Sequence, residues 1–486
     1  MSGQEIFALL PIAILGVGSV AVLLAGAFMP DVRGRYLNLC AALIALASAA
    51  TAAFYQPEVL GVADTLNMGN FGSFFTAIVG VATFLTLLLS VGYTERRPLG
   101  HEEFPALALF AAFGMSFLAS ATSLLGIFIG LESMTLALYV LLASNRSDPL
   151  SGEAGLKYLV VGAVSTAFFA FGLSLIYAAT GTLSVAGAMG ALTLTGKMGG
   201  VGLAGWAMLI VGFGFKASLF PFHLWAPDVY EGGPAPVVAF LSTGSKAAVF
   251  AAFIRLAMAT GAGWASLVPV LWVMAAFTMA FGNIAALTQD NVKRLLAYSS
   301  IAQMGYVLVA LIAAPATGGG AAVFYIVAYM AMDLGAFGVV ASFSGKDFEL
   351  KDIGRLRGAG YLYPYRGAAL AFCMLSLAGL PPTAGFIGKF GVFYAAVEAG
   401  YVYLAVIGIV TAIISVYYYL KVVVYLYMRP ADESEEGVAA LPGADLSTRI
   451  ALAVIVAAIL YLERAAAWIT RNPPPEWDGT ESFTEK

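Results

Sequence analysis

The sequence has very few of the residues that bind redox cofactors and metals. Among its 486 residues there are only two cysteines, Cys40 and Cys373, and only two histidines, His101 and His223. Iron–sulfur clusters and structural zinc sites each need about four ligands, drawn mainly from cysteine and histidine. This scarcity excludes such sites and paired haem histidines, so we predict no cofactor-binding and no metal-binding residues in the chain.

Charged residues are scarce as well. They make up 11% of the chain, whereas 61% is hydrophobic, and soluble domains carry roughly 25% charged residues. Such a composition cannot form a water-soluble domain. The net charge of −4 provides no basic face for nucleic acid. We therefore expect the lipid bilayer as a partner and no nucleic acid.

Long apolar runs fill most of the chain. A bilayer core needs about 20 apolar residues per helix, and cutting the sequence where charges, Gly and Pro cluster yields about 14 such segments. The fold class predicted is therefore an all-α polytopic membrane protein. The segments are 5–28, 37–54, 70–93, 104–121, 122–144, 153–179, 201–220, 235–258, 264–287, 293–314, 320–345, 366–399, 401–428 and 447–470.

The basic residues predict the orientation of these helices. Most of them, from Arg33 and Arg35 to Arg429 and Arg449, fall in or beside alternate loops, whereas 260–266 has none. Loops rich in Lys and Arg face the cytoplasm. With an even number of helices, we expect a multi-pass protein of a prokaryotic inner membrane with both termini on the non-cytoplasmic side.

Two of the predicted helices are interrupted by proline. Pro221 interrupts the seventh, and Pro381-Pro382 interrupts the twelfth. Proline removes a backbone donor, and at membrane depth a broken helix persists only where it lines protein or water. The alternative is that these prolines only kink the helices for packing.

The two breaks lie five helices apart. An odd offset inverts topology, so helices 4–8 and 9–13 are predicted to form two inverted five-helix repeats, an arrangement in which transporters bind substrates beside broken helices. The predicted divisions are three N-terminal helices in 1–103, the first repeat in 104–258, the second repeat in 259–428, and the last helix with a polar tail in 429–486.

Four ionisable residues lie deep inside the predicted helices. A charge at the bilayer centre costs at least about 2.5–3.5 kcal/mol, so such residues usually face a polar interior and act there. A static ion pair between Glu132 and Lys216 that only fixes packing is the alternative. The four residues predicted as a proton path are Glu132, Lys216, Lys246 and Lys389.

Four further residues are weaker candidates. Lys157 lies near a helix end, where a snorkelling anchor is the alternative. Asp333 either extends the polar axis or sits protonated against a backbone carbonyl. His223 either receives protons or has a hydrogen-bonded structural role. Tyr298, with Ser299, Ser300 and Gln303, either carries water across helix 10 or joins helices.

Three motifs surround the candidate lysines. They are Gly212-Phe213-Gly214-Phe215-Lys216 through Pro221-Phe222-His223 and Asp228-Val229-Tyr230-Glu231-Gly232-Gly233-Pro234-Ala235-Pro236 to Lys246, then Lys293-Arg294-Leu295-Leu296-Ala297-Tyr298-Ser299-Ser300, and Gly385-Phe386-Ile387-Gly388-Lys389-Phe390. With these motifs the sequence resembles the antiporter-like subunits of respiratory complex I, NADH:quinone oxidoreductase, and in particular the N-type subunit. The resemblance covers essentially all of the predicted helices.

The resemblance implies proton translocation driven by quinone reduction elsewhere in the complex. It implies that Glu132 and Lys216 form a labile pair, that Lys246 connects two half-channels, and that Lys389 leads to the external side. NADH, FMN, Fe–S clusters and quinone belong to the complex as a whole. The implied partners are homologous L-type and M-type subunits and small K-type and A/J-type subunits.

Some details bear on the type of subunit. Lys389 argues against the M type, which usually has glutamate there, and the polar Asn472-Pro473-Pro474-Pro475 tail replaces the lateral helix of the L type. Gln303 stands where some relatives have histidine, and Asp333 is unusual for the family. A subunit of a multisubunit cation/proton antiporter and a non-conducting structural subunit remain the alternative functions.

Overall fold

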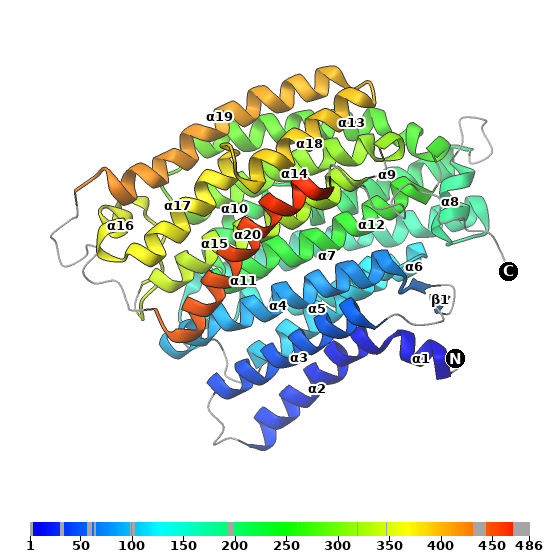
Figure 1. The fold of residues 1–486 in the computed structure, drawn as a ribbon. Helices are drawn as coiled ribbons and strands as arrows, with labels where there is room; N and C mark the ends of the chain where they lie inside the picture. The colour runs from blue at the N-terminus through cyan, green and yellow to red at the C-terminus, as the bar shows by residue number, and fades with distance from the viewer. Residues whose placement is uncertain are drawn as a thin grey trace.

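The computed structural model describes residues 3–29, 34–55, 61–62, 65–97, 99, 103–192, 199–259, 261–317, 319–346, 348–430 and 444–469. The polar tail at Asn472–Pro475, His101 and Arg33 lie outside these residues. In Figure 1 the helices lie side by side in one bundle, with α2 and α3 at one edge and α13 and α19 at the other.

Most of the predicted crossings are single helices. Thirteen described helical stretches are long and apolar enough to cross a membrane. They are α2 (Leu10–Phe28), α3 (Gly34–Phe54), α4 (Asn70–Arg96), α5 (Glu103–Ser120), α6 (Leu124–Leu142), α7 (Pro149–Thr180), α9 (Gly199–Lys216), α11 to α12 (Ala235–Ala259), α13 (Gly261–Leu287), α14 (Val292–Thr317), α15 (Gly320–Phe343), α19 (Val402–Tyr427) and α20 (Leu446–Ile469).

The remaining predicted crossing is made of two shorter helices. α17 (Pro364–Ala378) and α18 (Ala384–Glu398) have 15 residues each, so neither reaches across a bilayer alone. Together they fill the predicted segment 366–399. The prediction of about 14 crossings with a broken twelfth helix is therefore confirmed.

Several short elements were not predicted. A two-strand hairpin pairs β1 (Gly61–Val62) with β2 (Leu66–Asn67). The short helices are α1 (Gly3–Ala8), α8 (Val185–Ala191), α10 (Trp225–Gly232), a 3₁₀ turn (Ile353–Leu356) and α16 (Ala359–Leu362). Segments of two to eight residues are too short for hydrophobic periodicity to reveal.

Both helix breaks occur at the predicted prolines. α9 ends at Lys216, and the chain turns through Pro221 before α10 begins. The backbone groups freed there find partners, because Phe220 N donates to Thr278 Oγ1 at 2.9 Å and Trp225 Nε1 donates to Phe215 O at 3.0 Å. These contacts meet the requirement that non-helical backbone at membrane depth be satisfied by protein.

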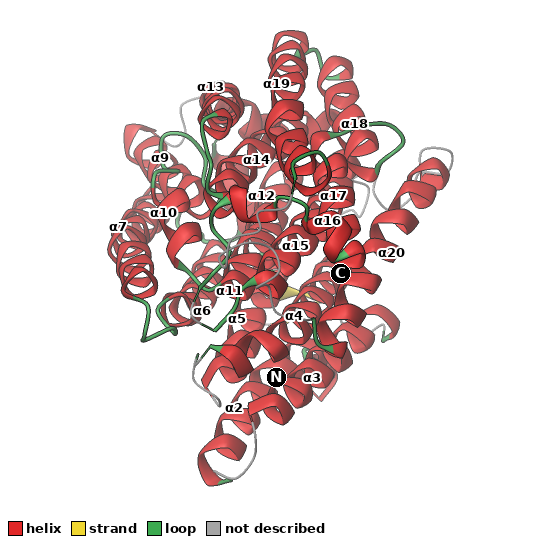
Figure 2. Ribbon diagram, turned by 90° about the vertical axis from the view of Figure 1, so that its left-hand side faces the viewer, coloured by secondary structure: helices red, strands yellow, loops and turns green. Residues whose placement is uncertain are grey.

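Corresponding helices of the two predicted repeats pack in corresponding ways. α5 packs on α6 as α13 packs on α14, α6 on α7 as α14 on α15, and α5 on α12 as α13 on α19. Figure 2 places α12, α14 and α15 in the interior of the bundle. The packing agrees with two five-helix repeats, whereas the division of the chain at residues 103, 258 and 428 stays a prediction.

One buried ion pair joins distant parts of the bundle. Lys293 Nζ, at the start of α14, lies 3.0 Å from Glu349 Oε2, and the side chains are 0% and 2% exposed. Glu349 Oε1 also accepts hydrogen bonds from Tyr93 OH and Ala235 N, both at 2.8 Å. Glu349 therefore ties the segment after α15 to α4, to the start of α11 and to α14.

Candidate functional site

The four main candidates lie in the interior of the bundle or at its margin. Lys216 ends α9, Lys246 begins α12, and Lys389 lies in α18. These lysines are only 4%, 2% and 5% exposed. Glu132 lies in the middle of α6 and is partly exposed. Three lysines are thus withdrawn from the surface at positions expected to be within the membrane.

Lys216 and Glu132 are held by threonines and not by each other. Lys216 Nζ donates to Thr135 Oγ1 at 2.7 Å, and Glu132 Oε1 accepts from Thr166 Oγ1 at 2.7 Å. Lys216 also lies 5.9 Å from the centre of the Tyr158 ring. Lys216 thus contacts α6 at Thr135, one helical turn from Glu132. The two charged residues do not form an ion pair with each other.

Lys246 follows an irregular turn of its helix. A π-helical turn, Leu241–Ser245, separates α11 (Ala235–Phe240) from α12 (Lys246–Ala259), and such turns are frequent at functional sites. Lys246 Nζ donates to Ser300 Oγ of α14 at 2.6 Å, and Ser300 Oγ lies 2.5 Å from Tyr329 OH of α15.

Asp333 terminates this set of hydrogen bonds. Its Oδ2 accepts from Tyr329 OH at 3.2 Å and from Ser242 Oγ. The carboxylate thus lies on the polar axis, which was one of the two predicted alternatives, and its Oδ2 partners are hydroxyls and not a backbone carbonyl. We call Lys246, Ser300, Tyr329 and Asp333 the Lys246 network.

Lys389 binds the open end of a broken helix. Its Nζ donates to Leu377 O at 2.9 Å and to Ala378 O at 3.1 Å. These carbonyls close α17, where helix geometry leaves the last carbonyls without intrahelical donors and gives them partial negative charge. The ammonium also lies 5.3 Å from the centre of the Tyr306 ring.

Gln303 joins the Lys389 site to α14. Its Nε2 donates to Leu377 O at 3.2 Å and to Tyr419 OH at 2.9 Å, and its Oε1 accepts from Tyr325 OH. Ser299 Oγ in turn contacts Tyr419 OH. These hydrogen bonds link α14 to the end of α17, to Tyr325 and to Tyr419. Because Ser299 precedes Ser300 in the chain, the Lys389 site and the Lys246 network meet on α14.

We call Lys216, Lys246 and Lys389, together with the polar residues that contact them or their partners, the buried row. Several of its members were not predicted from the sequence. Thr135, Tyr329 and Tyr419 are all buried and each contacts a candidate residue or its partner. Hydroxyl residues are ordinary components of membrane helices. In the sequence, a hydroxyl residue of the buried row could be recognised only where it shares a helix face with a charged residue. Tyr329 and Asp333 have this relation, four residues apart on α15.

His223 and Tyr298 lie apart from the row. The His223 ring is 2% exposed and packs edge-on against Phe281, with ring centres 4.6 Å apart. Neither of its nitrogens has a hydrogen-bond partner among the described residues, so the hydrogen-bonded structural role is not observed. Tyr298 is partly buried and makes no side-chain hydrogen bond to a described residue. Their roles in proton transfer stay predictions.

Lys157 is a surface residue. Its Nζ lies 2.7 Å from Glu153 and 2.8 Å from Asp228, and its side chain is 42% exposed. Arg294 shares Asp228 at 2.8 Å. This arrangement fits the predicted alternative of an anchor near the helix end, and it separates Lys157 from the buried lysines.

Replacing Lys157 by methionine is expected to have little effect. Exposed ion pairs contribute about 0–1 kcal/mol, and Asp228 keeps Arg294 as a partner. We expect unchanged assembly and a loss of at most about 1 kcal/mol in the free energy of unfolding, measured by denaturation in detergent. A loss several times larger would show that Lys157 belongs to the buried polar structure.

Metal chemistry finds little support in the part of the chain that the structure describes. Those residues contain no group of three or more His, Cys, Asp or Glu side chains that could hold a metal ion. Cys40 is exposed on α3, whereas Cys373 is buried in α17. The donor set does not fit an iron–sulfur cluster, which needs about four thiolates.

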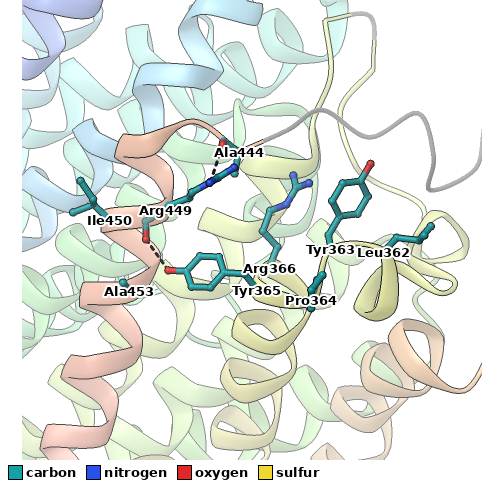
Figure 3. Close-up of a pocket in the computed structure, with 9 residues that line it drawn as sticks. All are labelled: Leu362, Tyr363, Pro364, Tyr365, Arg366, Ala444, Arg449, Ile450 and Ala453. Atoms are coloured by element: carbon teal, nitrogen blue, oxygen red, sulfur yellow. Dashed lines mark hydrogen bonds between the residues drawn. The ribbon is translucent and has the colours of Figure 1, made fainter.

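Two cavities differ in their relation to the row. The larger, about 620 Å³, lies between the starts of α17 and α20, and Tyr365 OH donates there to Arg449 O at 2.6 Å (Figure 3). It contains none of the predicted proton-path residues. A second cavity, about 440 Å³, is lined by apolar residues of α18 and α19 and by Lys389. Of these two cavities, the second includes a candidate residue of the predicted proton path, Lys389.

Comparison with known proteins identifies the family. The family described as NADH:quinone oxidoreductase/Mrp antiporter, TM, matches residues 121–415. NADH-quinone oxidoreductase subunit N of Geobacter metallireducens is 48% identical over 90% of this chain and 92% of its own length. The subunit N of Geotalea uraniireducens is 44% identical over 95% and 97%.

Solved structures have the same fold. A chain of respiratory complex I from Thermus thermophilus matches with a TM-score of 0.77 and 33% identity, over 95% of this chain and 98% of that one. A chain of the Mrp complex from Dietzia matches with a TM-score of 0.77 at 21% identity, over 99% of each chain, which indicates the fold alone. The chain therefore belongs to the NADH:quinone oxidoreductase/Mrp antiporter family of membrane subunits, within the group of NADH-quinone oxidoreductase N subunits.

Proposed function

We propose that this chain carries protons across the membrane as part of NADH:quinone oxidoreductase, through Glu132, Lys216, Lys246 and Lys389. The energy comes from quinone reduction elsewhere in the complex. NADH, FMN, Fe–S clusters and quinone bind to other subunits. The role of this chain is to hold and release protons at defined side chains.

The observation that carries this proposal is that no carboxylate of the described residues lies within ion-pair distance of three buried lysines. Among the described residues, Lys216, Lys246 and Lys389 donate only to hydroxyls and backbone carbonyls. By contrast, the buried Lys293 has a carboxylate 3.0 Å away. A lysine that only stabilises the fold is expected to resemble Lys293, because an unpaired buried charge is costly. The other three are suited to gain and lose a proton.

The energies involved have a suitable size. Moving one proton against 100 mV takes about 2.3 kcal/mol, and a hydrogen bond to a charged group contributes about 1.5–3 kcal/mol. The free energy of one contact, such as that between Lys216 Nζ and Thr135 Oγ1, is therefore similar to the free energy needed to move one proton.

The residues take successive roles along the bundle. Glu132 and Lys216 form the entrance, where closing or opening their contact changes the proton affinity of Lys216. Lys246 links the two repeats through α14. Lys389, held by the carbonyls at the end of α17, passes protons toward the external side of the membrane.

The surroundings of the chain follow from the same assignment. We infer a prokaryotic inner membrane, with both termini on the non-cytoplasmic side and L-type, M-type, K-type and A/J-type subunits as neighbours. Large apolar side chains of outer helices such as α2, α7 and α19 are exposed, among them Val17, Phe171 and Tyr403. Lipid and neighbouring subunits would cover these surfaces.

The direct test compares Lys216→Met with Lys157→Met in assembled complex in sealed membrane vesicles. Proton pumping is measured beside NADH oxidation, with and without a protonophore. We expect Lys216→Met to reduce pumping at least tenfold and Lys157→Met to retain it. Normal pumping by Lys216→Met would overturn the proposal. Sodium-dependent transport that persists without electron flow would favour an antiporter instead.

A further inference from the structure

Asp333 is a buried carboxyl group that contacts no cation within the part of the chain that the structure describes. It lies in α15 and is 0% exposed. Its Oδ2 accepts from two hydroxyls, whereas its Oδ1 has no hydrogen-bond partner among the described residues. An isolated buried carboxylate is strongly disfavoured, and it persists only with a charge partner or by taking up a proton.

Lys246 is the cation nearest to Asp333 along a set of hydrogen bonds. The other titratable groups that face Asp333 are Tyr329 on its own helix, Tyr230 on α10, Tyr419 on α19 and Cys373 on α17. These groups are ordinarily neutral at physiological pH. Ser242 and Lys246 lie four residues apart, so one face of the helix supplies both a donor to Asp333 and the ammonium.

The hydrogen bonds between Lys246 and Asp333 have one direction. Lys246 has only donors, so Ser300 Oγ accepts from it at 2.6 Å. Tyr329 OH donates to Asp333 Oδ2 at 3.2 Å, which leaves its oxygen to accept. The Ser300 hydroxyl hydrogen therefore points to Tyr329, 2.5 Å away. Every donor in the Lys246 network points from the lysine to the carboxylate.

From this geometry we propose that Asp333 is the internal proton acceptor of Lys246, reached through the hydroxyls of Ser300 and Tyr329. This inference rests on the proposed function. In the transfer, one N–H bond of Lys246 breaks, Ser300 and Tyr329 each accept one proton and release their own, and one O–H bond forms on Asp333. An ammonium and a carboxylate become a neutral amine and a neutral carboxylic acid.

The transfer gives the centre of the chain a charge switch of its own. Two buried charges cancel without either side chain moving far, and the reverse transfer restores them. At the entrance, Lys216 likewise donates to a hydroxyl, that of Thr135, which lies three residues from Glu132 on α6. Each of these two lysines thus contacts a hydroxyl group and not a carboxylate.

The test uses three variants in the assembled complex. Asp333→Asn keeps the size of the side chain and an oxygen to accept from Ser242 and Tyr329, but it cannot take a proton. Tyr329→Phe interrupts the relay and leaves both end groups in place. Thr243→Val removes a buried hydroxyl of the same helical turn, whose hydrogen bond to Ala239 O lies within its own helix and outside the relay, and it serves as the matched control.

We expect Asp333→Asn and Tyr329→Phe to lower proton pumping at least fivefold, whereas Thr243→Val stays within twofold of the wild type and Asp333→Glu pumps more than Asp333→Asn. Infrared difference spectra during turnover should contain a protonated-carboxyl band that Asp333→Asn removes. If Asp333→Asn fails to assemble, Tyr329→Phe decides.

Two results would overturn this inference. One is normal pumping by Tyr329→Phe, whatever Asp333→Asn does, and the other is normal pumping by Asp333→Asn. If Lys216→Met abolishes pumping in the same experiment, the proposed function stands and only the role of Asp333 fails. If Lys216→Met also pumps normally, the proposed function itself fails.

Discussion

Replacing Lys389 by methionine should abolish proton pumping by the assembled complex, with a loss of at least tenfold. Methionine has similar length but cannot hold a proton, so the step that leads from α14 to the external side would be missing. The change also removes two hydrogen bonds to the carbonyls that end α17. Pumping is measured in sealed vesicles beside the rate of NADH oxidation.

The experiment with Lys389→Met must distinguish the loss of a proton-carrying group from a displacement of the end of α17. Gln303 still donates to Leu377 O in the variant, so we expect α17 to keep its position and the complex to assemble. Lys421→Met is a suitable control, because Lys421 lies on the adjacent α19 in an ion pair with Asp290 at 2.7 Å. Equal losses in both variants would contradict a specific role for Lys389.

The crossings could be predicted because hydrophobic length is a local property. The predicted segment 70–93 corresponds to α4 at Asn70–Arg96, and the broken segment 366–399 corresponds to α17 and α18. Pro221 and Pro381 marked the breaks because proline removes a helix donor wherever it occurs. The pairing of β1 with β2 escaped prediction, since strands of two residues are too short to show a periodic pattern.

The candidate site could be predicted only in part. A lysine inside an apolar helix is visible in the sequence, and Lys216, Lys246 and Lys389 are all buried. Their partners were not visible, because Thr135 and Tyr329 differ in no local way from other hydroxyl residues of membrane helices. Which of them meets a lysine depends on contacts between helices that are far apart in the sequence.

Lys293 and Glu349 are charged residues whose burial could not be predicted from the sequence. Both belong to charged stretches near predicted loops, where the sequence indicates solvent exposure. Yet the pair is buried, and Lys293 Nζ also donates to Gly233 O at 2.5 Å. A charge close to a predicted loop is therefore not always a surface charge, and the position of its partner decides.

Replacing Glu349 by glutamine is accordingly expected to destabilise the chain by about 3–5 kcal/mol, because removing one member of a buried pair leaves the other charge uncompensated. The amide oxygen still accepts from Tyr93 or Ala235, but it offers Lys293 no negative charge. The measurement is thermal or detergent denaturation of the purified complex, followed by release of this subunit. Combining Glu349→Gln with Lys293→Met should cost less than the sum of the two single changes.

An exposed pair provides the control for this prediction. Arg35 and Glu95 lie 3.7 Å apart with side chains 45% and 47% exposed, and Glu95→Gln should cost at most about 1 kcal/mol. Similar costs for Glu95→Gln and Glu349→Gln would show that water reaches the Lys293–Glu349 pair. A large cost for Glu349→Gln alone, with normal proton pumping by the complex that remains assembled, would show that Lys293 has a structural role. It would thereby separate Lys293 from the three lysines that we propose carry protons.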